Sequence, residues 1–286
     1  MTDPTAALPL DAHLHTDLSP DADVPIDAYG AAARERGIAE VAITDHLDFD
    51  PEGPAYDYAD YGRRLRHVRA AGERWEGRPT IRFGIEMTYQ RQYEAAIRAH
   101  LAGHRYDYVV GSVHIAKRDP LRSGATAAAW CAGKSHGEAS APYFAEVEAA
   151  IRSGLFDTIG HLDFVKRYTV AHLGPFRYED HADLYDRLLV ALVESGMALE
   201  VNSSGLRQAA REPYPTPVVV ERFRALGGAR VVAGSDAHQI GSFAFGLEEA
   251  YRSIAAAGYR SLSFRRGRDR VEVPLETDLV AALARR

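Results

Sequence analysis

Short apolar runs alternate with longer amphipathic segments along most of the chain. Seven of these runs have the length and the apolar content of a buried strand. They are Leu8–Leu14, Glu40–Thr44, Ile81–Ile85, Tyr106–Val113, Phe156–Gly160, Ala198–Val201 and Arg230–Ala233. Because segments of helical length separate them, the pattern predicts parallel strands that are joined by helices.

The amphipathic segments carry clear end signals. Six of them stop directly before a glycine, which commonly ends a helix, and one begins with Pro217, which suits a first helical turn. Helices are predicted over Ile26–Arg36, Tyr61–Trp75, Gln92–Ala102, Tyr143–Ser153, Asp180–Ser195, Pro217–Leu226 and Gly246–Ala257, and from about Thr277 to the C-terminus.

Seven or eight β/α repeats in 286 residues fit a single domain, residues 1–286, better than two. We expect a closed barrel, and an open doubly wound sheet is the alternative. The run Ser261–Phe264 is either an eighth strand or part of a small appendage with Arg270–Val273. Two long stretches without periodicity, Asp45–Tyr61 and Ile115–Ala141, are either functional loops at the rim or solvated insertions.

The composition narrows the possible chemistry. The single cysteine, Cys131, excludes an internal disulfide and a cysteine zinc site, whereas twelve histidines offer metal ligands. The formal net charge of -6 argues against a nucleic-acid binder, and we expect the basic run Arg265–Arg270 to be a solvated face. The sequence holds no apolar run of signal-peptide or membrane-spanning length. We therefore expect a cytoplasmic protein that binds neither nucleic acid nor membranes.

Half of the histidines, and several carboxylates, lie where the predicted strands end. The candidate metal ligands are His13, His15, His46, Glu86, His114, His161, Asp236 and His238, with Asp21 a few residues beyond the first strand as a further candidate. His13 and His15 are two residues apart, so they point to the same face of a strand, and Asp236 and His238 repeat this spacing. All strand ends of a parallel barrel meet at one rim, where these side chains would converge.

Each of these residues alone has an ordinary structural explanation, such as a buried hydrogen-bonded histidine or a capping aspartate. Six of the seven predicted strand ends carry His, Asp or Glu, and this coincidence indicates a metal site. The set suffices for two or three divalent ions, Zn, Mn or Fe, held by imidazole and carboxylate. The remaining histidines are predicted on helices or loops as surface or structural residues: His67, His100, His104, His136, His172 and His181.

The order and spacing of these motifs resemble the PHP (polymerase and histidinol phosphatase) family. The matching segments are His13-Leu14-His15, Thr44-Asp45-His46, Glu86, Ser112-Val113-His114, Gly160-His161 and Ser235-Asp236-Ala237-His238. The resemblance implies an α/β fold, namely a distorted, TIM-like (β/α)7 barrel with a trinuclear metal centre at the C-terminal ends of the strands. The segments His15–Asp21, Gly160–Tyr168 and Glu200–Arg207 resemble the histidinol-phosphate phosphatases within that family.

The resemblance also implies an activity, the hydrolysis of L-histidinol phosphate to L-histidinol and phosphate in histidine biosynthesis. It maps Arg167 and Arg207 onto arginines that hold the substrate phosphate, and a guanidinium group suits phosphate oxygens on chemical grounds. Asp21 stands where some members have a histidine ligand of the third ion. The imidazole and the ammonium group of such a substrate would also need partners. Polar or acidic candidates are Asp48, Asp50, Glu52 and Glu212, and aromatic candidates are Tyr89, Tyr168 and Tyr214.

The expected roles at the centre follow from metal-assisted phosphate ester hydrolysis. We expect Asp236 to bind metal and to accept the proton of the attacking water. His238 is expected to bind metal and to assist proton transfer to the leaving oxygen. Glu86 would bridge two ions, and Asp45 would orient His46 or a neighbouring ligand as a second layer of contacts.

Three other functions stay open. The first is a PHP phosphoesterase that acts on another small phosphate or a nucleotide. The second is an amidohydrolase-type metal hydrolase, although such enzymes usually bridge their metals with a lysine, where this chain offers Glu86. The third is a metal-dependent binding module without activity. The sequence leaves the oligomeric state open.

Overall fold

The computed structural model describes residues 8–115, 119–122 and 124–284. The strands are β1 (Leu10–Leu14), β2 (Glu40–Ile43), β3 (His46–Leu47), β4 (Thr80–Thr88), β5 (Tyr108–Ser112), β6 (Thr158–Ile159), β7 (Ala198–Asn202), β8 (Val231–Gly234), β9 (Ser261–Arg266) and β10 (Asp269–Pro274). The α-helices are α1 (Ile26–Arg36), α2 (Tyr61–Arg74), α3 (Glu94–Gly103), α4 (Gly124–Cys131), α5 (His136–Ser153), α6 (Lys166–Leu173), α7 (Ala182–Ser195), α8 (Pro217–Ala225), α9 (Leu247–Ala256) and α10 (Thr277–Ala284). Short 3-10 helices are η1 (Arg91–Tyr93), η2 (Pro120–Arg122), η3 (Ser203–Arg207) and η4 (Ile240–Ser242).

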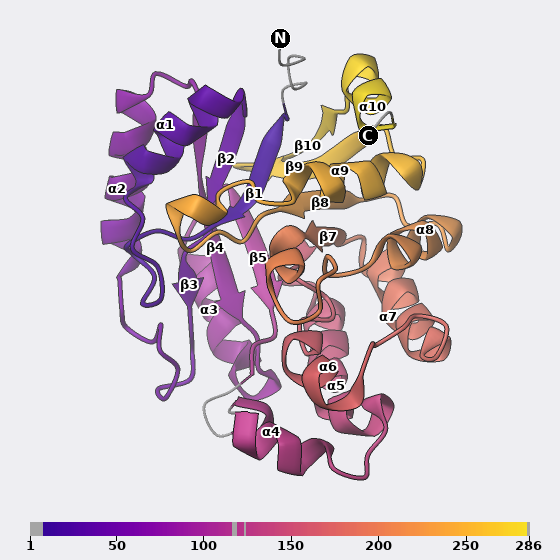
Figure 1. The fold of residues 1–286 in the computed structure, drawn as a ribbon. Coiled ribbons are helices and arrows are strands. Elements are labelled where there is room, and N and C mark those ends of the chain that lie inside the picture. Colours follow the sequence, from indigo (N-terminus) through magenta and orange to yellow (C-terminus); the bar gives the residue numbers. More distant parts are fainter. Residues whose placement is uncertain (1–7, 116–118, 123, 285–286) are drawn as a thin grey trace.

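Parallel strands form the centre of the molecule, with helices around them (Figure 1). They run side by side in the order β1-β2-β4-β5-β6-β7-β8, which confirms the predicted distorted barrel of seven strands. The long strand β4 pairs with β2 along its first half and with the short β3 near its end, where His46 lies opposite Glu86. The strands are buried over most of their length, as expected for a parallel sheet covered by helices.

The barrel closes between β1 and β8 through only a few backbone contacts. The amide of His15 donates to the carbonyl of Ala237 at 3.0 Å, and the amide of Asp236 donates to the carbonyl of His13 at 2.8 Å. Deeper in this seam the Asp11 carboxylate takes the place of a strand partner. It accepts hydrogen bonds from the Ser235 amide at 2.9 Å and the Ser235 hydroxyl at 2.6 Å.

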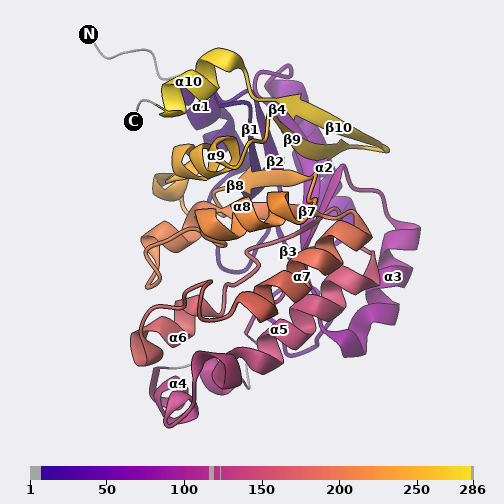
Figure 2. The ribbon, with the colours of Figure 1, turned by 90° about the vertical axis from the view of Figure 1, so that its right-hand side faces the viewer.

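Local sequence signals explain where the helices begin and end. Helix α1 stops at Gly37, whose φ of 69° is the left-handed conformation that glycine adopts readily. Helix α5 starts with a capping box, in which the Ser135 hydroxyl and the Glu138 side chain each satisfy a backbone amide of the other residue. Figure 2 shows α5 and α7 side by side on one flank of the barrel.

One predicted loop proves to be largely helical. The stretch Ile115–Ala141 contains η2, α4 and the first turns of α5, which extends seven residues before the predicted start at Tyr143. Pro142 lies inside α5, and a proline there removes a helical hydrogen bond, so the sequence pattern suggested a boundary that the tertiary packing overrides. The short helix α6 was also not predicted. The other loop, Asp45–Tyr61, contains only β3 and turns before α2 begins.

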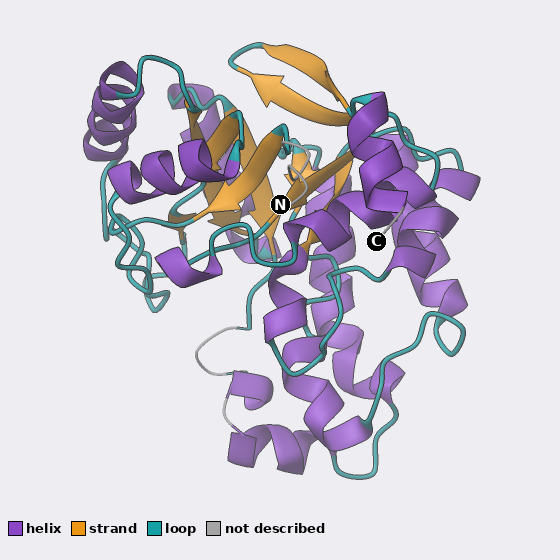
Figure 3. Cartoon of the chain, turned by 45° about the horizontal axis from the view of Figure 1, so that its top comes forward, coloured by secondary structure: helices purple, strands orange, loops and turns teal. Residues whose placement is uncertain are grey.

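The C-terminal hairpin of β9 and β10 is the appendage that the sequence left as one of two possibilities. It is antiparallel and separate from the main sheet, as Figure 3 shows. The expectation of a solvated basic face is wrong for its first two arginines. Arg265 contacts Asp157 at 2.7 Å and Arg266 contacts Glu40, so these ion pairs fasten the hairpin to the barrel. Within the described residues no helix has the length and apolar character needed to cross a bilayer.

Candidate metal centre

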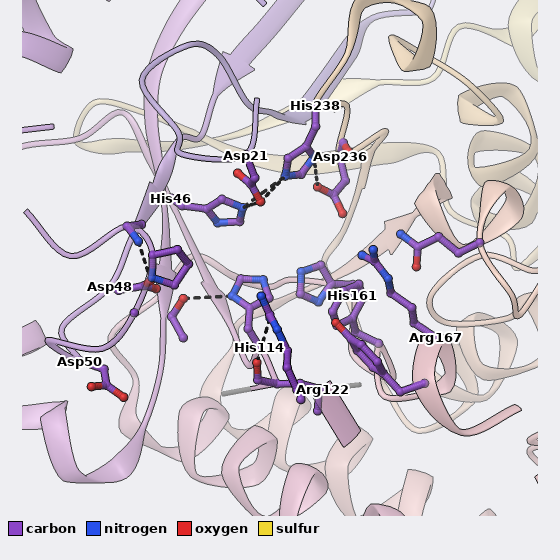
Figure 4. A pocket seen from close by; sticks show the side chains of 18 of the residues that line it. Asp21, His46, Asp48, Asp50, His114, Arg122, His161, Arg167, Asp236 and His238 are labelled. Carbon is purple, nitrogen blue, oxygen red and sulfur yellow. Dashed lines mark hydrogen bonds and ion pairs between the residues drawn. The ribbon is translucent and has the colours of Figure 1, made fainter. Parts of the chain in front are cut away.

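The histidines and carboxylates predicted as ligands converge on one cavity at the C-terminal ends of the strands (Figure 4). The cavity has a volume of about 1070 Å³. Its walls include six of the nine candidates, namely Asp21, His46, His114, His161, Asp236 and His238. The other three, His13, His15 and Glu86, are fully buried and contact all of those six except Asp21. Residues more than 200 positions apart in the chain therefore meet at this rim.

Glu86 is the centre of the buried group. Its Oε1 atom lies 3.4 Å from His13 Nε2 and 3.0 Å from His161 Nε2, and its Oε2 atom lies 2.7 Å from His46 Nδ1. His114 Nε2 is 3.4 Å from Oε1. Ring nitrogens thus surround both oxygens of this carboxylate, so it could hold two ions.

Asp236 is a second carboxylate that several imidazoles share. Its Oδ1 atom lies 3.3 Å from His15 Nε2, 3.5 Å from His238 Nδ1 and 3.8 Å from His13 Nε2. Burial alone would raise the pKa of Asp236, but the surrounding histidines hold it well below its ordinary value. The same balance, with His13, His46 and His114 as the neighbours, keeps the pKa of Glu86 low. Both carboxylates are therefore anionic.

Asp21 joins the outer edge of the cluster. Its Oδ2 atom lies 3.5 Å from His46 Nε2 and 3.4 Å from His238 Nε2, and those two nitrogens are 3.2 Å apart. Figure 4 shows the three side chains facing one another at the mouth of the cavity. Two imidazoles and a carboxylate that point at one position form a plausible set of ligands for a further ion.

The buried polar atoms of the cluster fit metal ions better than they fit one another. His13 Nε2, His15 Nε2, His161 Nδ1 and Glu86 Oε2 are buried and make no well-directed hydrogen bond, although three of them lie 2.7–3.4 Å from a group of opposite charge. Such atoms are costly unless something satisfies them. Three groups have ligand atoms close enough for one ion: His15 with His46 and His238, His13 with His15 and Glu86, and His46 with Glu86 and His114. The donor set is nitrogen and oxygen only, which suits divalent ions such as Zn.

The sequence analysis missed the residue that orients His13. Glu200 is fully buried on β7, and its Oε1 atom lies 2.7 Å from His13 Nδ1. When the imidazole proton is on Nδ1 and is donated to Glu200, the lone pair of His13 Nε2 is free to bind a metal. The Oε2 atom accepts the His161 amide at 2.8 Å and the Asn202 side-chain amide at 3.0 Å. The available signal was a lone carboxylate within the apolar run Ala198–Val201.

Asp45 is linked to two of the candidate ligands through one intervening residue, Ser19. Its carboxylate accepts hydrogen bonds from the Thr16 amide at 2.6 Å and from the Ser19 hydroxyl at 2.9 Å. Ser19 Oγ in turn lies 3.3 Å from His15 Nδ1 and accepts the His46 amide at 2.9 Å. Asp45 thus supports both histidines through Ser19. Thr88, which the sequence analysis also missed, supports His114 in the same manner at 3.0 Å.

The backbone is strained at two of the ligands. Asp236 has a φ of 52° and His161 a φ of 23°, and residues with a side chain seldom adopt such positive values. Arg207 holds the strained turn, because its guanidinium donates to the carbonyl of Ser235 at 2.8 Å and to that of Asp236. Arg207 also lines the cavity. This arginine therefore has a structural task in addition to the predicted contact with phosphate.

Arg167 lies on one side of the candidate ligands, whereas Asp21 and Asp236 lie among them (Figure 4). Arg167 lies over the rings of Phe164 and Tyr168, at 5.4 and 5.7 Å from their centroids. Arg122 on η2 also lines the cavity, and no sequence signal singled it out. On the opposite side lie Asp48 and Asp50.

The remaining candidates for substrate recognition divide into two groups. Glu52 and Tyr168 line the cavity. Glu212 and Tyr214 do not, because Glu212 pairs with Lys166 at 2.8 Å and Tyr214 is fully buried. Tyr89 is likewise buried and donates to Glu94 outside the cavity. The other six histidines lie on helices or beside them, away from the cluster, as predicted.

Comparison with known proteins decides the family. The chain matches the PHP domain over residues 11–204. The chain belongs to the PHP domain family. A PHP relative from Deinococcus radiodurans, named probable histidinol-phosphatase, is 33% identical over 263 residues, which cover 89% of this chain and 96% of that protein. The histidinol-phosphatase of Lactococcus lactis is 23% identical over 259 residues, which cover 89% of this chain and 93% of that protein.

Solved structures agree on the PHP barrel. The Lactococcus lactis histidinol phosphate phosphatase, crystallised with Zn, L-histidinol and phosphate, superposes with a TM-score of 0.82. The sequence identity is 21%, and the match covers 93% of this chain and 100% of the other. A structure described as a putative histidinol phosphatase from Listeria monocytogenes superposes with a TM-score of 0.71 at 20% identity, over 83% of this chain and 98% of the other. These likenesses establish the fold.

Proposed function

We propose that this PHP protein is a metal-dependent phosphomonoesterase that hydrolyses L-histidinol phosphate to L-histidinol and phosphate, a step of histidine biosynthesis. One observation carries the proposal. The cavity combines buried ligand atoms that lack well-directed hydrogen bonds with Arg167 on one side and Asp48 and Asp50 on the other. A phosphate ester that also carries an amine matches this distribution of charge. The names of the relatives point to the same reaction.

The ion content is part of the proposal. The nine candidate ligands His13, His15, Asp21, His46, Glu86, His114, His161, Asp236 and His238 would hold two to three divalent ions. Zn, Mn and Fe all suit the donors, and the solved Lactococcus lactis protein contains Zn. When bound, such ions activate water near neutral pH and neutralise charge on the phosphoryl group.

The protein's own groups have distinct tasks in this reaction. Asp236 accepts the proton of the attacking water, because its carboxylate lines the cavity beside His13 and His15. His238 also lines the cavity, and it donates a proton to the leaving oxygen. Arg167 and Arg207 hold the phosphoryl oxygens, and their planar donors suit the charge that spreads over these oxygens during displacement.

The acidic side of the cavity selects the rest of the substrate. Asp48 and Asp50 lie across the metal cluster from Arg167, so a substrate that is held by its phosphate extends toward them. Their carboxylates would meet its ammonium group. Tyr168 lines the cavity and offers a ring face to the imidazole.

Phosphate release from L-histidinol phosphate tests the proposal. The purified protein would be stripped with a chelator, reconstituted with Zn, Mn or Fe in turn, and assayed against L-histidinol phosphate and a panel of sugar phosphates and nucleotides. We expect metal-dependent turnover with the highest kcat/KM for L-histidinol phosphate. A higher kcat/KM for another ester would assign a different substrate, and no turnover with any metal would refute an enzymatic function. Metal analysis of the active form would count the ions.

A further inference from the structure

Lys166 is a buried cation that the proposed reaction does not use. Its side chain is 1% exposed, although it directly precedes the cavity residue Arg167 at the start of α6. The Nζ atom lies 2.7 Å from Asp163 Oδ2 and 2.8 Å from Glu212 Oε1. Buried lysines are rare unless they are paired, so a contact of this kind has a reason in the structure.

One carboxylate is enough to balance the charge of Lys166, and Glu212 is a second one. Asp163 alone neutralises Lys166, and the Tyr185 hydroxyl already donates to Asp163 at 2.6 Å. Glu212 comes from a different part of the chain, and its side chain is 34% exposed. Partial removal of a carboxylate from water is unfavourable. Because Asp163 already neutralises Lys166, the contact of Glu212 with this pair needs a further explanation.

Glu212 belongs to the segment of residues 203–214, which leaves β7 and returns to it. The segment ends where Asn202 and Tyr214 exchange two backbone hydrogen bonds of 2.8 Å. Within it the chain folds tightly on itself, because a Cβ atom on Gly205 would lie 2.1 Å from the Glu212 carbonyl oxygen. The same segment carries Arg207. The Lys166–Glu212 contact thus joins the two pieces of chain that supply Arg167 and Arg207 to the cavity.

Those two arginines repel each other when no anion lies between them. Burial lowers the pKa of Arg207, and the positive charge of Arg167 adds to this effect, whereas the carboxylates of Asp236 and Asp11 oppose it. Both line the same cavity. The 203–214 segment is also held by the Arg207 hydrogen bonds to the carbonyls of Ser235 and Asp236. Loss of the Lys166–Glu212 contact would loosen its spacing from α6, and ordering that spacing on binding would weaken phosphate affinity.

We propose that Lys166 is a positioning residue that sets the spacing of Arg167 and Arg207 for a phosphoryl group by linking α6, through Asp163 and Glu212, to the 203–214 segment. This inference rests on the proposed function only in that it takes both arginines as phosphate ligands. Among the described residues, the Lys166 ammonium group pairs with Asp163 and Glu212 and with none of the candidate metal ligands.

Glu212→Gln is the decisive variant, because Lys166→Met would leave Asp163 buried without its partner and endanger folding. Glu212→Gln removes a negative charge near an anion site, so electrostatics alone predicts tighter phosphate binding. Positioning predicts the opposite. We expect the Kd for inorganic phosphate, measured by calorimetry on the metal-loaded protein, and the KM for L-histidinol phosphate to rise about three- to tenfold, with kcat changed less than about twofold.

Glu148→Gln provides the matched control. Glu148 pairs with Arg152 and Arg187 on the outer face of α5, and we expect its loss to leave phosphate affinity unchanged. A double-mutant cycle separates positioning from general damage. In an Arg167→Gln background, Glu212→Gln should have little further effect on phosphate affinity, whereas a general structural defect would add its full cost.

The outcomes distinguish this inference from the proposed function. Unchanged or tighter phosphate binding in Glu212→Gln, or full additivity with Arg167→Gln, would overturn the positioning role. A wild-type protein that binds no phosphate would overturn it as well. Weaker phosphate binding in a protein that does not hydrolyse L-histidinol phosphate would support the role of Lys166 and refute the proposed substrate.

Discussion

Replacing Glu200 by glutamine tests whether a residue that orients a candidate ligand, here His13, controls metal binding. The side chain keeps its size but loses its charge and one acceptor oxygen. If the amide oxygen faces His13, the amide nitrogen faces two donors, the His161 backbone amide and the Asn202 side chain. The side-chain amide of Asn202 cannot flip, because its own oxygen accepts the Ser204 amide at 3.0 Å.

The opposite orientation of the glutamine is no better. The amide nitrogen would then face His13 Nδ1, which must become an acceptor, so the proton of the imidazole would move to Nε2. A protonated Nε2 does not bind a metal. Either orientation therefore costs a buried hydrogen bond or the ligand itself.

The size of the effect follows from these contacts. Loss of a group that orients a metal-bound histidine typically lowers metal affinity about 10- to 100-fold. An unsatisfied buried donor costs ~1–3 kcal/mol of folding free energy. For a chain of this size, each kcal/mol corresponds to a melting temperature lower by about 2–4 °C. We expect Glu200→Gln to fold, to melt several degrees earlier and to lose metal at chelator concentrations that wild type withstands.

Competition with a metal-buffering chelator, followed by metal analysis, measures this affinity directly. Glu194→Gln is the control, because Glu194 is an exposed helix residue whose nearest charged partner is Arg152 at 3.6 Å. Equal metal retention in Glu200→Gln and wild type would refute the argument that Glu200 fixes the tautomer of His13. Loss of metal in both variants would show that the assay reports charge rather than orientation.

Three other changes test separate parts of the structure. Asp236→Asn should lower kcat by at least about 100-fold with an unchanged circular dichroism spectrum, and near-normal turnover would exclude Asp236 as proton acceptor. Arg167→Gln should raise the phosphate Kd about 10- to 100-fold, because a charge-assisted contact is lost, and a normal Kd would remove Arg167 from the phosphate site. Burial, aided by the charge of His104, lowers the pKa of His100 to about 4, so the unfolded chain binds more protons between pH 6.5 and 4. Stability should therefore fall by at most ~3 kcal/mol over that range, and urea unfolding of His100→Gln should show a smaller fall.

Much of the fold was predictable because strands and rim residues obey short-range rules. Parallel strands that are buried on both faces produce apolar runs, and glycines mark the helix ends, so Ile26–Arg36 was predicted to the residue. The positions of the ligands followed from the same runs, since side chains at the C-terminal ends of parallel strands share a rim. His13, His46 and Glu86 meet there as expected.

Tertiary contacts explain what the pattern left out. Helix α4 is rich in alanine but has no amphipathic stripe that would mark a buried face, and Pro142 conceals the first half of α5. Glu200 stood at the start of a matching segment but was given no role, because its importance arises from its contact with His13, 187 positions earlier in the chain. Contacts of that range depend on how the barrel closes and do not follow from local periodicity.

The seam between β1 and β8 connects the distortion of the barrel to the chemistry of the site. His13 and His15 lie on one side of this seam, and Asp236 and His238 lie on the other. Because regular strand pairing is limited there, the chain at Asp236 is free to take its left-handed conformation, which directs the carboxylate toward both histidines. A regular ladder would hold residue 236 in extended conformation and turn its side chain by the alternation of a strand. The side chain of Asp11 replaces the missing ladder contacts, so the barrel stays closed without straightening the turn on which the metal centre depends.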